Sequence, residues 1–349
     1  MSKFRVGILC LLVLSMVSLG WAQEQRAADQ QLISVKEDGT FDKTGLEVPP
    51  MKKAHLKIGF SPNAMNTQYD MVISGCKEAI SKLPDPSSVD FVIQAPTNHS
   101  DTAEQMDIIE SWIQQKYDVI AVCSVNDMAM YPVYRMAAAA GIPIFHFNTP
   151  SSSLVDPFFV STVTCNQVMA GQAIGEAFVK RYGKKDTNIV VIEGLVGTPH
   201  NTERINGFKK AIAGVNNFHI IDMQAADWVR DKAQTVMEDL LTKYGKKINV
   251  VWGMYDEMAL GAVSAIKSRG LTKQIEVWGY DNTEDAYNSI LRGEMFGTVD
   301  TASKQSGRDL INSIVKYCMK GEMIPKQVYV PPVVYTRDNI KTFNTSEYK

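Results

Sequence analysis

Short apolar runs alternate with longer amphipathic stretches along most of the chain, beginning near residue 51. In the first half the apolar runs are H-L-K-I-G-F-S, V-D-F-V-I-Q, Y-D-V-I-A-V-C-S and I-P-I-F-H-F, and the stretches between them have the pattern of helices. Short continuous apolar strands between helices are typical of a parallel sheet covered on both faces, with right-handed crossovers. The pattern therefore predicts an α/β lobe.

The same alternation then begins again. Helices are predicted at Q-V-M-A-G-Q-A-I-G-E-A-F-V-K-R and N-T-E-R-I-N-G-F-K-K-A-I, and strands at N-I-V-V-I-E, F-H-I-I-D-M and I-N-V-V-W-G. We therefore predict an α/β fold of two doubly wound parallel-sheet lobes. Ligands bind such sheets at the carboxyl ends of the strands, so the residues just after each strand are the informative ones.

The N-terminus differs from this pattern. Lys3 and Arg5 precede an apolar run that ends at G-W-A-Q, with Gly20 and Ala22 placed for cleavage before Gln23. We interpret residues 1–22 as a signal peptide for export to the periplasm. A membrane anchor is the alternative, but the run is shorter than the roughly 20 residues that span a bilayer. Lipidation of Cys10 is disfavoured because few apolar residues precede it.

Residues 23–50 are polar, weakly periodic and closed by two prolines, which favours a flexible leader. The rest of the 349-residue chain is long enough for two domains with cores of their own. A net charge of −2 gives no basic surface for nucleic acid or anionic lipid. Four cysteines beyond the signal peptide lack CxxC spacing, so we expect buried thiols at Cys76, Cys123, Cys165 and Cys318.

The predicted loops contain no familiar catalytic motif. We find no G-x-G-x-x-G, G-x-x-x-x-G-K-[ST], G-x-S-x-G or H-E-x-x-H, so dinucleotide, phosphoryl, serine-hydrolase and zinc-protease chemistry lack their groups. His146, inside a predicted strand, is interpreted as a core residue, and the role of His200 stays open. We predict a binding protein with no enzymatic activity, cofactor or metal.

Several segments together resemble a known family. G-I-P-I-F-H-F-N, G-T-P-H-N-T-E-R-I-N-G-F, A-A-D-W, D-E-M-A-L-G-A and V-W-G-Y-D-N-T are similar, in this order, to segments of the ribose- and galactose-type periplasmic sugar-binding proteins of ABC importers. The resemblance covers roughly residues 54–335. It implies two lobes, a three-strand hinge and a ligand clamped between the lobes, which is the type I periplasmic binding protein fold.

The resemblance also implies domain boundaries. The first lobe would comprise residues 52–162 and 302–329, and the second lobe residues 163–301 and 330–345. The hinge strands would then lie near Thr162, Thr301 and Val330, and the helix at 303–319 would return to the first lobe.

Ligand-binding residues follow from the same comparison, position by position. Tyr255 would point into the cleft, Asp281 would accept sugar hydroxyls, and aromatic side chains would cover the apolar faces of the sugar. Asp256, which follows Tyr255, is interpreted as a helix N-cap. The predicted ligand-binding set is Asn66, Tyr69, Asn148, Trp228, Tyr255 and Asp281, with Asn126, Thr202, Asp300 and Thr301 as further candidates.

Departures from the family pattern limit the identification of the ligand. Asn148 and Thr149 stand where ribose binders have Asp-Arg, and Thr202 stands where they have a second arginine, with Arg204 two residues further on. We therefore expect that no arginine contacts the ligand. The ligand would then be a monosaccharide other than ribose, a polyol or a furanosyl signal. A-P-T-N-H-S and S-V-N-D-M-A-M-Y-P are similar to the branch with rhamnose and autoinducer-2 receptors.

The expected function is capture of this ligand between closing lobes and its delivery to an inner-membrane ABC permease, by a protein that is itself a monomer. The alternative is a ligand-sensing subunit for a chemoreceptor or sensor kinase. A sugar-responsive repressor would carry an N-terminal helix-turn-helix, where this chain has the export signal.

Overall fold

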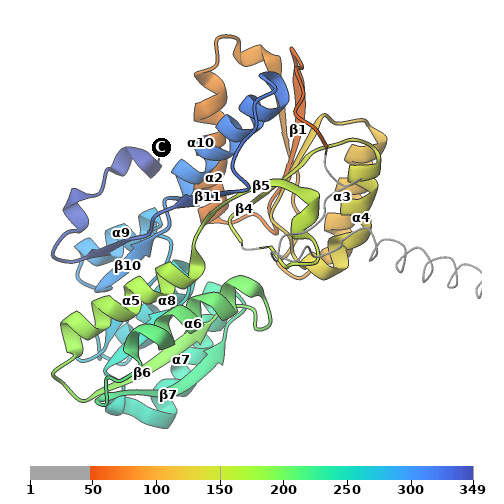
Figure 1. Ribbon diagram of the computed structural model, residues 1–349. Helices are drawn as coiled ribbons and strands as arrows, with labels where there is room; N and C mark the ends of the chain where they lie inside the picture. The colour runs from red at the N-terminus through yellow and green to blue at the C-terminus, as the bar shows by residue number, and fades with distance from the viewer. Residues whose placement is uncertain (1–47, 150, 349) are drawn as a thin grey trace, which may run out of the picture. The chain divides into compact units, whose positions relative to one another are not determined.

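The computed structural model describes residues 48–149 and 151–348, so the predicted signal peptide at 1–22 and most of the leader at 23–50 lie outside the described residues. Within these ranges the strands form two sheets (Figure 1). No helix in the described part is long and apolar enough to cross a membrane.

The first sheet is parallel throughout and has the order β11-β5-β4-β3-β1-β2. Its strands are β1 (Leu56–Ser61), β2 (Val89–Ile93), β3 (Val119–Val122), β4 (Ile144–Phe147), β5 (Phe159–Cys165) and β11 (Gln327–Val330). Its helices are α2 (Thr67–Ser81), α3 (Thr102–Gln114), α4 (Asp127–Ala139) and α10 (Ser303–Ile314), which continues as a short π-helix (Val315–Met319). α2 packs against α10 and α3 against α4, and Figure 1 shows the two pairs on opposite sides of the sheet.

The second sheet repeats this order of connections as β12-β10-β9-β8-β6-β7, with β12 antiparallel to β10. Its strands are β6 (Thr187–Glu193), β7 (Phe218–Ala225), β8 (Val250–Gly253), β9 (Glu276–Trp278), β10 (Gly297–Asp300) and β12 (Val333–Thr336). Its helices are α5 (Gln167–Tyr182), α6 (Pro199–Ile212), α7 (Arg230–Tyr244), α8 (Asp256–Ser268) and α9 (Glu284–Leu291). Single-turn helices occur at Pro86–Ser88, Asp156–Phe158, Gly245–Lys247, Ile340–Thr342 and Thr345–Tyr348.

The chain passes from one sheet to the other after β5, after β10 and between β11 and β12. β5 continues to Cys165, a few residues beyond the expected crossing at Thr162, whereas β10 ends at Asp300 and β11 at Val330. α10 packs on α2 of the first sheet after the second crossing. Relative motion of two lobes about these connections stays a prediction.

Buried apolar strands and capped helices explain why the sequence forms these elements. Leu56, Ile58 and Phe60 of β1 are completely buried, which stabilises the sheet because their apolar surface is removed from water. Polar residues in the segments between strands and helices cap the helices: Asn66 Oδ1 accepts a hydrogen bond from Tyr69 N, and Asn166 Oδ1 accepts one from Met169 N. Polar side chains are thereby placed at the carboxyl edges of both sheets.

Two glycines bring α5 and α6 into close contact. A Cβ atom on Gly171 would lie 2.0 Å from the carbonyl oxygen of Arg204, and one on Gly207 would lie 2.0 Å from the carbonyl oxygen of Val168. Neither position has room for a side chain. The glycines therefore fix how closely α6, which carries Arg204, packs on α5.

The cysteines agree with the expectation from sequence. Cys76, Cys123, Cys165 and Cys318 are all free and buried, so the prediction of buried thiols is confirmed for the described residues.

Candidate ligand-binding site

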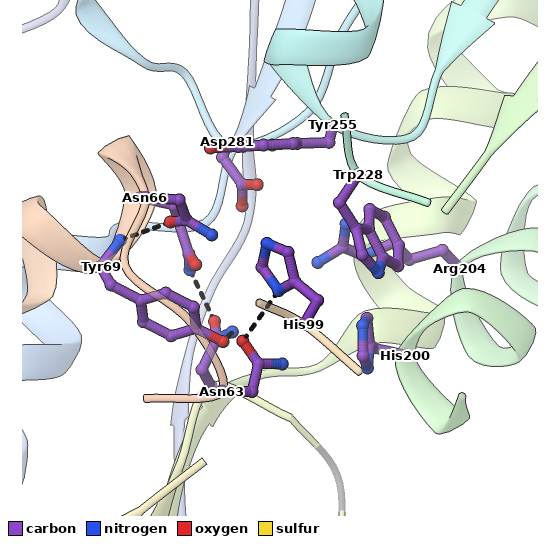
Figure 2. A pocket seen from close by; sticks show the side chains of 11 residues that line it. Asn63, Asn66, Tyr69, His99, His200, Arg204, Trp228, Tyr255 and Asp281 are labelled. Atoms are coloured by element: carbon purple, nitrogen blue, oxygen red, sulfur yellow. Dashed lines mark hydrogen bonds between the residues drawn. The ribbon is translucent and has the colours of Figure 1, made fainter. Parts of the chain in front are cut away.

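A polar pocket lies where loops from the two sheets meet (Figure 2). It encloses about 320 Å³ of space not filled by protein atoms, part of it open to solvent. Loops and helix starts of the first sheet contribute Asn63, Asn66, Gln68, Tyr69, His99 and Asn148, and those of the second sheet contribute His200, Arg204, Trp228, Tyr255 and Asp281. A ligand held here would contact both halves of the chain.

On the first-sheet side, hydrogen bonds orient the amide of Asn148. Gln68 Nε2 donates to Asn148 Oδ1 at 2.6 Å, and Asn148 Nδ2 donates to the Tyr69 hydroxyl at 3.0 Å. Asn148 has a φ of 67°, a left-handed conformation that asparagine tolerates better than most residues. The side chain is thus held in one orientation at the pocket wall.

Two histidines line the pocket, one from each side. His99 Nδ1 lies 3.3 Å from Asn63 Oδ1, and burial lowers the pKa of His99. Burial also places the pKa of His200 well below its usual value, and the nearby charge of Arg204 lowers it further. Both imidazoles are therefore neutral at neutral pH, when each carries one donor and one acceptor nitrogen.

On the second-sheet side, Arg204 is buried and held by three neighbours. Its Nε donates to Gln167 Oε1 at 2.7 Å, its Nη1 donates to the Met254 carbonyl at 2.6 Å, and its guanidinium lies 3.7 Å from the ring centroid of Tyr280. These contacts pre-organise the planar donor fork, which suits recognition of hydroxyl and ring oxygens.

Trp228 forms an aromatic wall together with His200. The two rings stack with centroids 5.0 Å apart and an interplanar angle of 25°. Trp228 has a φ of 67° and follows Asp227 with a φ of 51°, so the backbone turns sharply after β7. A Cβ on Gly194 would lie 2.0 Å from the Trp228 ring, so glycine is needed there for the indole to take this position.

Asp281 and Tyr255 complete the wall. Thr301 Oγ1 donates to Asp281 Oδ1 at 2.9 Å. Burial raises the pKa of Asp281, while the positive charge of Arg204 and the bond from Thr301 act in the opposite direction. Among the described residues, the buried Tyr255 hydroxyl and His200 Nδ1 have no hydrogen-bond partner. Unpaired polar atoms in a pocket are suited to bonding with a ligand, because an unmade buried bond is costly.

Six of the ten predicted residues line this pocket, namely Asn66, Tyr69, Asn148, Trp228, Tyr255 and Asp281. The other four do not. Asn126 is an exposed N-cap that accepts from Ala129 N, and Thr202 is exposed with its hydroxyl bonded to the Thr198 carbonyl. Asp300 and Thr301 are buried behind the pocket, and Thr301 reaches it through Asp281.

The pocket also contains His200, whose role the sequence left open, and four residues that sequence reasoning missed: Asn63, Gln68, His99 and Arg204. The expectation of a pocket without arginine is wrong, because Arg204 lines it. Arg204 follows His200 by four residues on α6, so both side chains lie on the same face of this helix. That spacing was the available signal.

Asp256 is not the N-cap that we expected, because Tyr255 occupies that position. The Asp256 carboxylate is completely buried and accepts hydrogen bonds from Tyr280 N, Thr283 N and Thr298 Oγ1, at 2.7–2.8 Å. It fixes the loop between β9 and α9, which carries Asp281. The local capping pattern could not reveal these partners, which are distant in sequence.

Two sheets of matching topology, with a polar pocket between their loops, are the architecture of a solute-binding protein. The chain belongs to the periplasmic binding protein domain family, whose sequence model matches residues 58–322.

Known proteins of this family resemble the chain over most of its length. It is 30% identical to the galactofuranose-binding protein YtfQ of Escherichia coli over 241 residues, which cover 68% of this chain and 76% of that protein. It is 29% identical to the xylitol-binding protein of Mycolicibacterium smegmatis over 280 residues, covering 78% and 77% of the two chains.

A solved structure shows the same fold. The periplasmic solute-binding protein of an ABC transporter from Actinobacillus succinogenes, with bound D-allose, aligns with a TM-score of 0.76 and 25% identity over 82% of this chain and 100% of that one.

These findings confirm the family and the fold class predicted from sequence. The protein is a periplasmic solute-binding protein of the ABC-importer type, which acts with a membrane permease and is not an enzyme.

Proposed function

We propose that the protein captures an uncharged monosaccharide or small polyol, with furanose sugars and pentitols as the first candidates. The balance of charge in the pocket carries this proposal. Its charged side chains, Arg204 and Asp281, have opposite signs, and burial keeps its two histidines neutral. A ligand with a net charge would meet no matching excess charge.

The shape and chemistry of the wall support the same class of ligand. Trp228, Tyr69 and Tyr255 offer aromatic surface for C–H faces, while amides, imidazoles and the charged pair surround it with hydrogen-bonding groups. The relatives are named for galactofuranose and xylitol, and the aligned structure contains D-allose. All three are small, neutral and rich in hydroxyl groups.

Binding would favour closure of the two lobes. Contacts from both sheets are made together only when the lobes are close, so a ligand shifts the population toward the closed form. No bond is made or broken in this process. Closure would then present one surface, drawn from both lobes, to the permease.

A thermal-shift screen tests the proposal. The panel contains D-galactose, L-arabinose, D-allose, D-ribose, xylitol and myo-inositol, with glucose 6-phosphate and glutamate as charged comparisons. We expect a neutral sugar or polyol to raise the melting temperature, and isothermal titration calorimetry to give a single site. A shift by the charged compounds alone contradicts the proposal.

The cleavage site and the monomeric state are also part of the proposal. Cleavage after Ala22 would release a monomer beginning at Gln23, which intact-mass analysis and size-exclusion chromatography with light scattering measure directly. A mass that retains residues 1–22, or a lipid on Cys10, contradicts it. Loss of ligand uptake on deletion of the gene distinguishes transport from service to a chemoreceptor or sensor kinase.

A further inference from the structure

A second cavity adjoins the ligand pocket, and we call it the outer chamber. It encloses about 690 Å³ of space not filled by protein atoms, part of it open to solvent. The loop after β3 and the first turn of α4 form one wall, and Gly197, Thr198 and Pro199 at the start of α6 form the other. His200 lines both cavities, so they share a wall at this side chain.

Two buried polar atoms of the outer chamber's walls lack hydrogen-bond partners among the described residues. His200 is 8% exposed, and its Nδ1 has no partner. The Asp127 side chain is also 8% exposed; its Oδ2 accepts from Ser152 N at 2.8 Å, while Oδ1 has no hydrogen-bond partner. Asp127 Oδ1 lies 3.9 Å from His146 Nε2, which is beyond hydrogen-bonding distance.

The walls also indicate which substituent would fit. Asp127 is the charged residue among those lining the chamber, and no lysine or arginine lines it, so a phosphate or carboxylate would be repelled. Hydroxyl groups can donate to Asp127 and exchange hydrogen bonds with Thr149 and Thr198. Met128, which is 58% exposed, and Pro199 supply apolar surface for the C–H face of a ring.

We propose that the natural ligand is a glycoside that fills both cavities, with one sugar in the pocket and a second sugar or similar polyhydroxylated group in the outer chamber. This proposal rests on the proposed function, which it extends from a monosaccharide to a disaccharide or substituted sugar. The second unit is uncharged, and one of its hydroxyl groups donates a hydrogen bond to Asp127.

Titration calorimetry with paired probes tests the proposal. One pair is methyl β-D-galactofuranoside and a galactofuranosyl-galactofuranoside disaccharide, and the other is methyl α-L-arabinofuranoside and the corresponding arabinofuranosyl disaccharide. In at least one pair we expect the disaccharide to bind about tenfold tighter or more, because the second unit adds its own contacts. Equal or weaker binding of the disaccharide in both pairs overturns the proposal.

Variants locate the second unit. Thr198→Trp places an indole in the outer chamber, and Met128→Trp does so from the opposite wall, which provides a second variant if the first does not fold. Each should remove the extra affinity for the disaccharide and leave binding of the methyl glycoside within about twofold. The matched control is Thr202→Trp, one turn further along α6 at an exposed position outside the chamber.

The outcomes separate the two proposals. Suppose that the methyl glycosides or free monosaccharides bind, the disaccharides do not, and the tryptophan variants leave every affinity unchanged. The outer chamber is then not part of the site, while the proposed function stands. If no sugar or polyol binds to the folded protein, both proposals are wrong.

Discussion

Asp281 contributes a carboxyl group to the wall of the pocket. It has a φ of 102°, which is unusual for an aspartate, and its backbone N–H donates to the Val299 carbonyl at 2.7 Å. Thr301 orients its Oδ1, while Oδ2 accepts no hydrogen bond from the described residues. A carboxylate held in this way is a strong acceptor for a hydroxyl group.

Asp281→Asn should therefore weaken ligand binding by roughly tenfold to a hundredfold, since a charge-assisted hydrogen bond in a buried site contributes about 1.5–3 kcal/mol. Calorimetric titration with the ligand identified in the screen measures the change. Thr202→Ala, at an exposed position on α6, is the control and should bind like the parent. Normal folding with unchanged affinity in Asp281→Asn would show that this carboxylate does not contact the ligand.

Asp300, at the end of β10, affects how the stability of the protein depends on pH. Burial raises its pKa to about 7, against the hydrogen bond from Ala302 N, which lowers it. In an unfolded chain the group titrates near ~3.9. Between about pH 4 and pH 7 the folded protein thus binds more protons than the unfolded chain, so this group's contribution to stability falls as the pH rises through that window.

Asp300→Asn removes this titration and keeps an oxygen that can accept from Ala302 N. The variant should gain melting temperature relative to the parent at pH 8, and the gain should shrink toward pH 4. Thermal unfolding monitored by circular dichroism across this range measures the difference. Asp338→Asn, at an exposed position, should show no comparable trend, and a pH-independent difference for Asp300→Asn would refute the assignment.

The residues that sequence reasoning found share one property: they follow a strand directly or belong to the turn after it. Tyr255 comes after β8 and Asp281 after β9, so the rule for parallel sheets located them. His99 lies well beyond β2 in a long loop, and Arg204 lies within a helix, so position in the loop gave no signal for either. Their placement depends on tertiary packing.

At the scale of elements, the close contact between α5 and α6 fixes the position of Arg204. The alternation of strands and helices was predictable because short apolar runs between longer amphipathic stretches are typical of buried strands between helices. The contact between the two helices was not, since it depends on Gly171 meeting the Arg204 carbonyl oxygen from a helix more than twenty residues away in sequence.

Gly171→Ala should push the two helices apart. Overpacking of this kind destabilises proteins by typically 1–3 kcal/mol, and here it should also weaken ligand binding because the backbone of Arg204 moves. Urea unfolding and calorimetric titration measure the two effects. Glu176→Ala, on the exposed face of the same helix, should change neither the stability nor the ligand affinity by a comparable amount. If Gly171→Ala is destabilised but binds the ligand like the parent, the position of Arg204 does not determine ligand affinity.

Gln167 connects the two halves of the pocket. It lies just after the first crossing between the sheets, and its Nε2 donates to the Asn148 carbonyl at 3.1 Å, on the first-sheet side. Its Oε1 accepts from Arg204 Nε and from the Tyr280 hydroxyl, each at 2.7 Å, on the second-sheet side. One buried amide thus orients groups of both lobes.

Gln167→Met keeps the approximate size of the side chain and removes all of these bonds. We expect an affinity loss of about tenfold, although Gln167 does not line the pocket, since Arg204 and Asn148 lose a common support. Gln167→Glu, which keeps the acceptor oxygens for Arg204 and Tyr280, should lose less. Equal losses in the two variants would mean that the link to Asn148 alone matters.

The buried cysteines make the protein suitable for a fluorescent reporter. The thiolate is the form that reacts with maleimide dyes, and burial raises the pKa of Cys123 to about 11 and those of Cys165 and Cys318 to about 12, so these thiols stay protonated and out of reach. Burial raises the pKa of Cys76 as well. In a chain produced without residues 1–22, and so without Cys10, a single cysteine introduced at Val229, which is 47% exposed beside Trp228, would then take the dye alone, and its emission would follow occupancy of the pocket in real time.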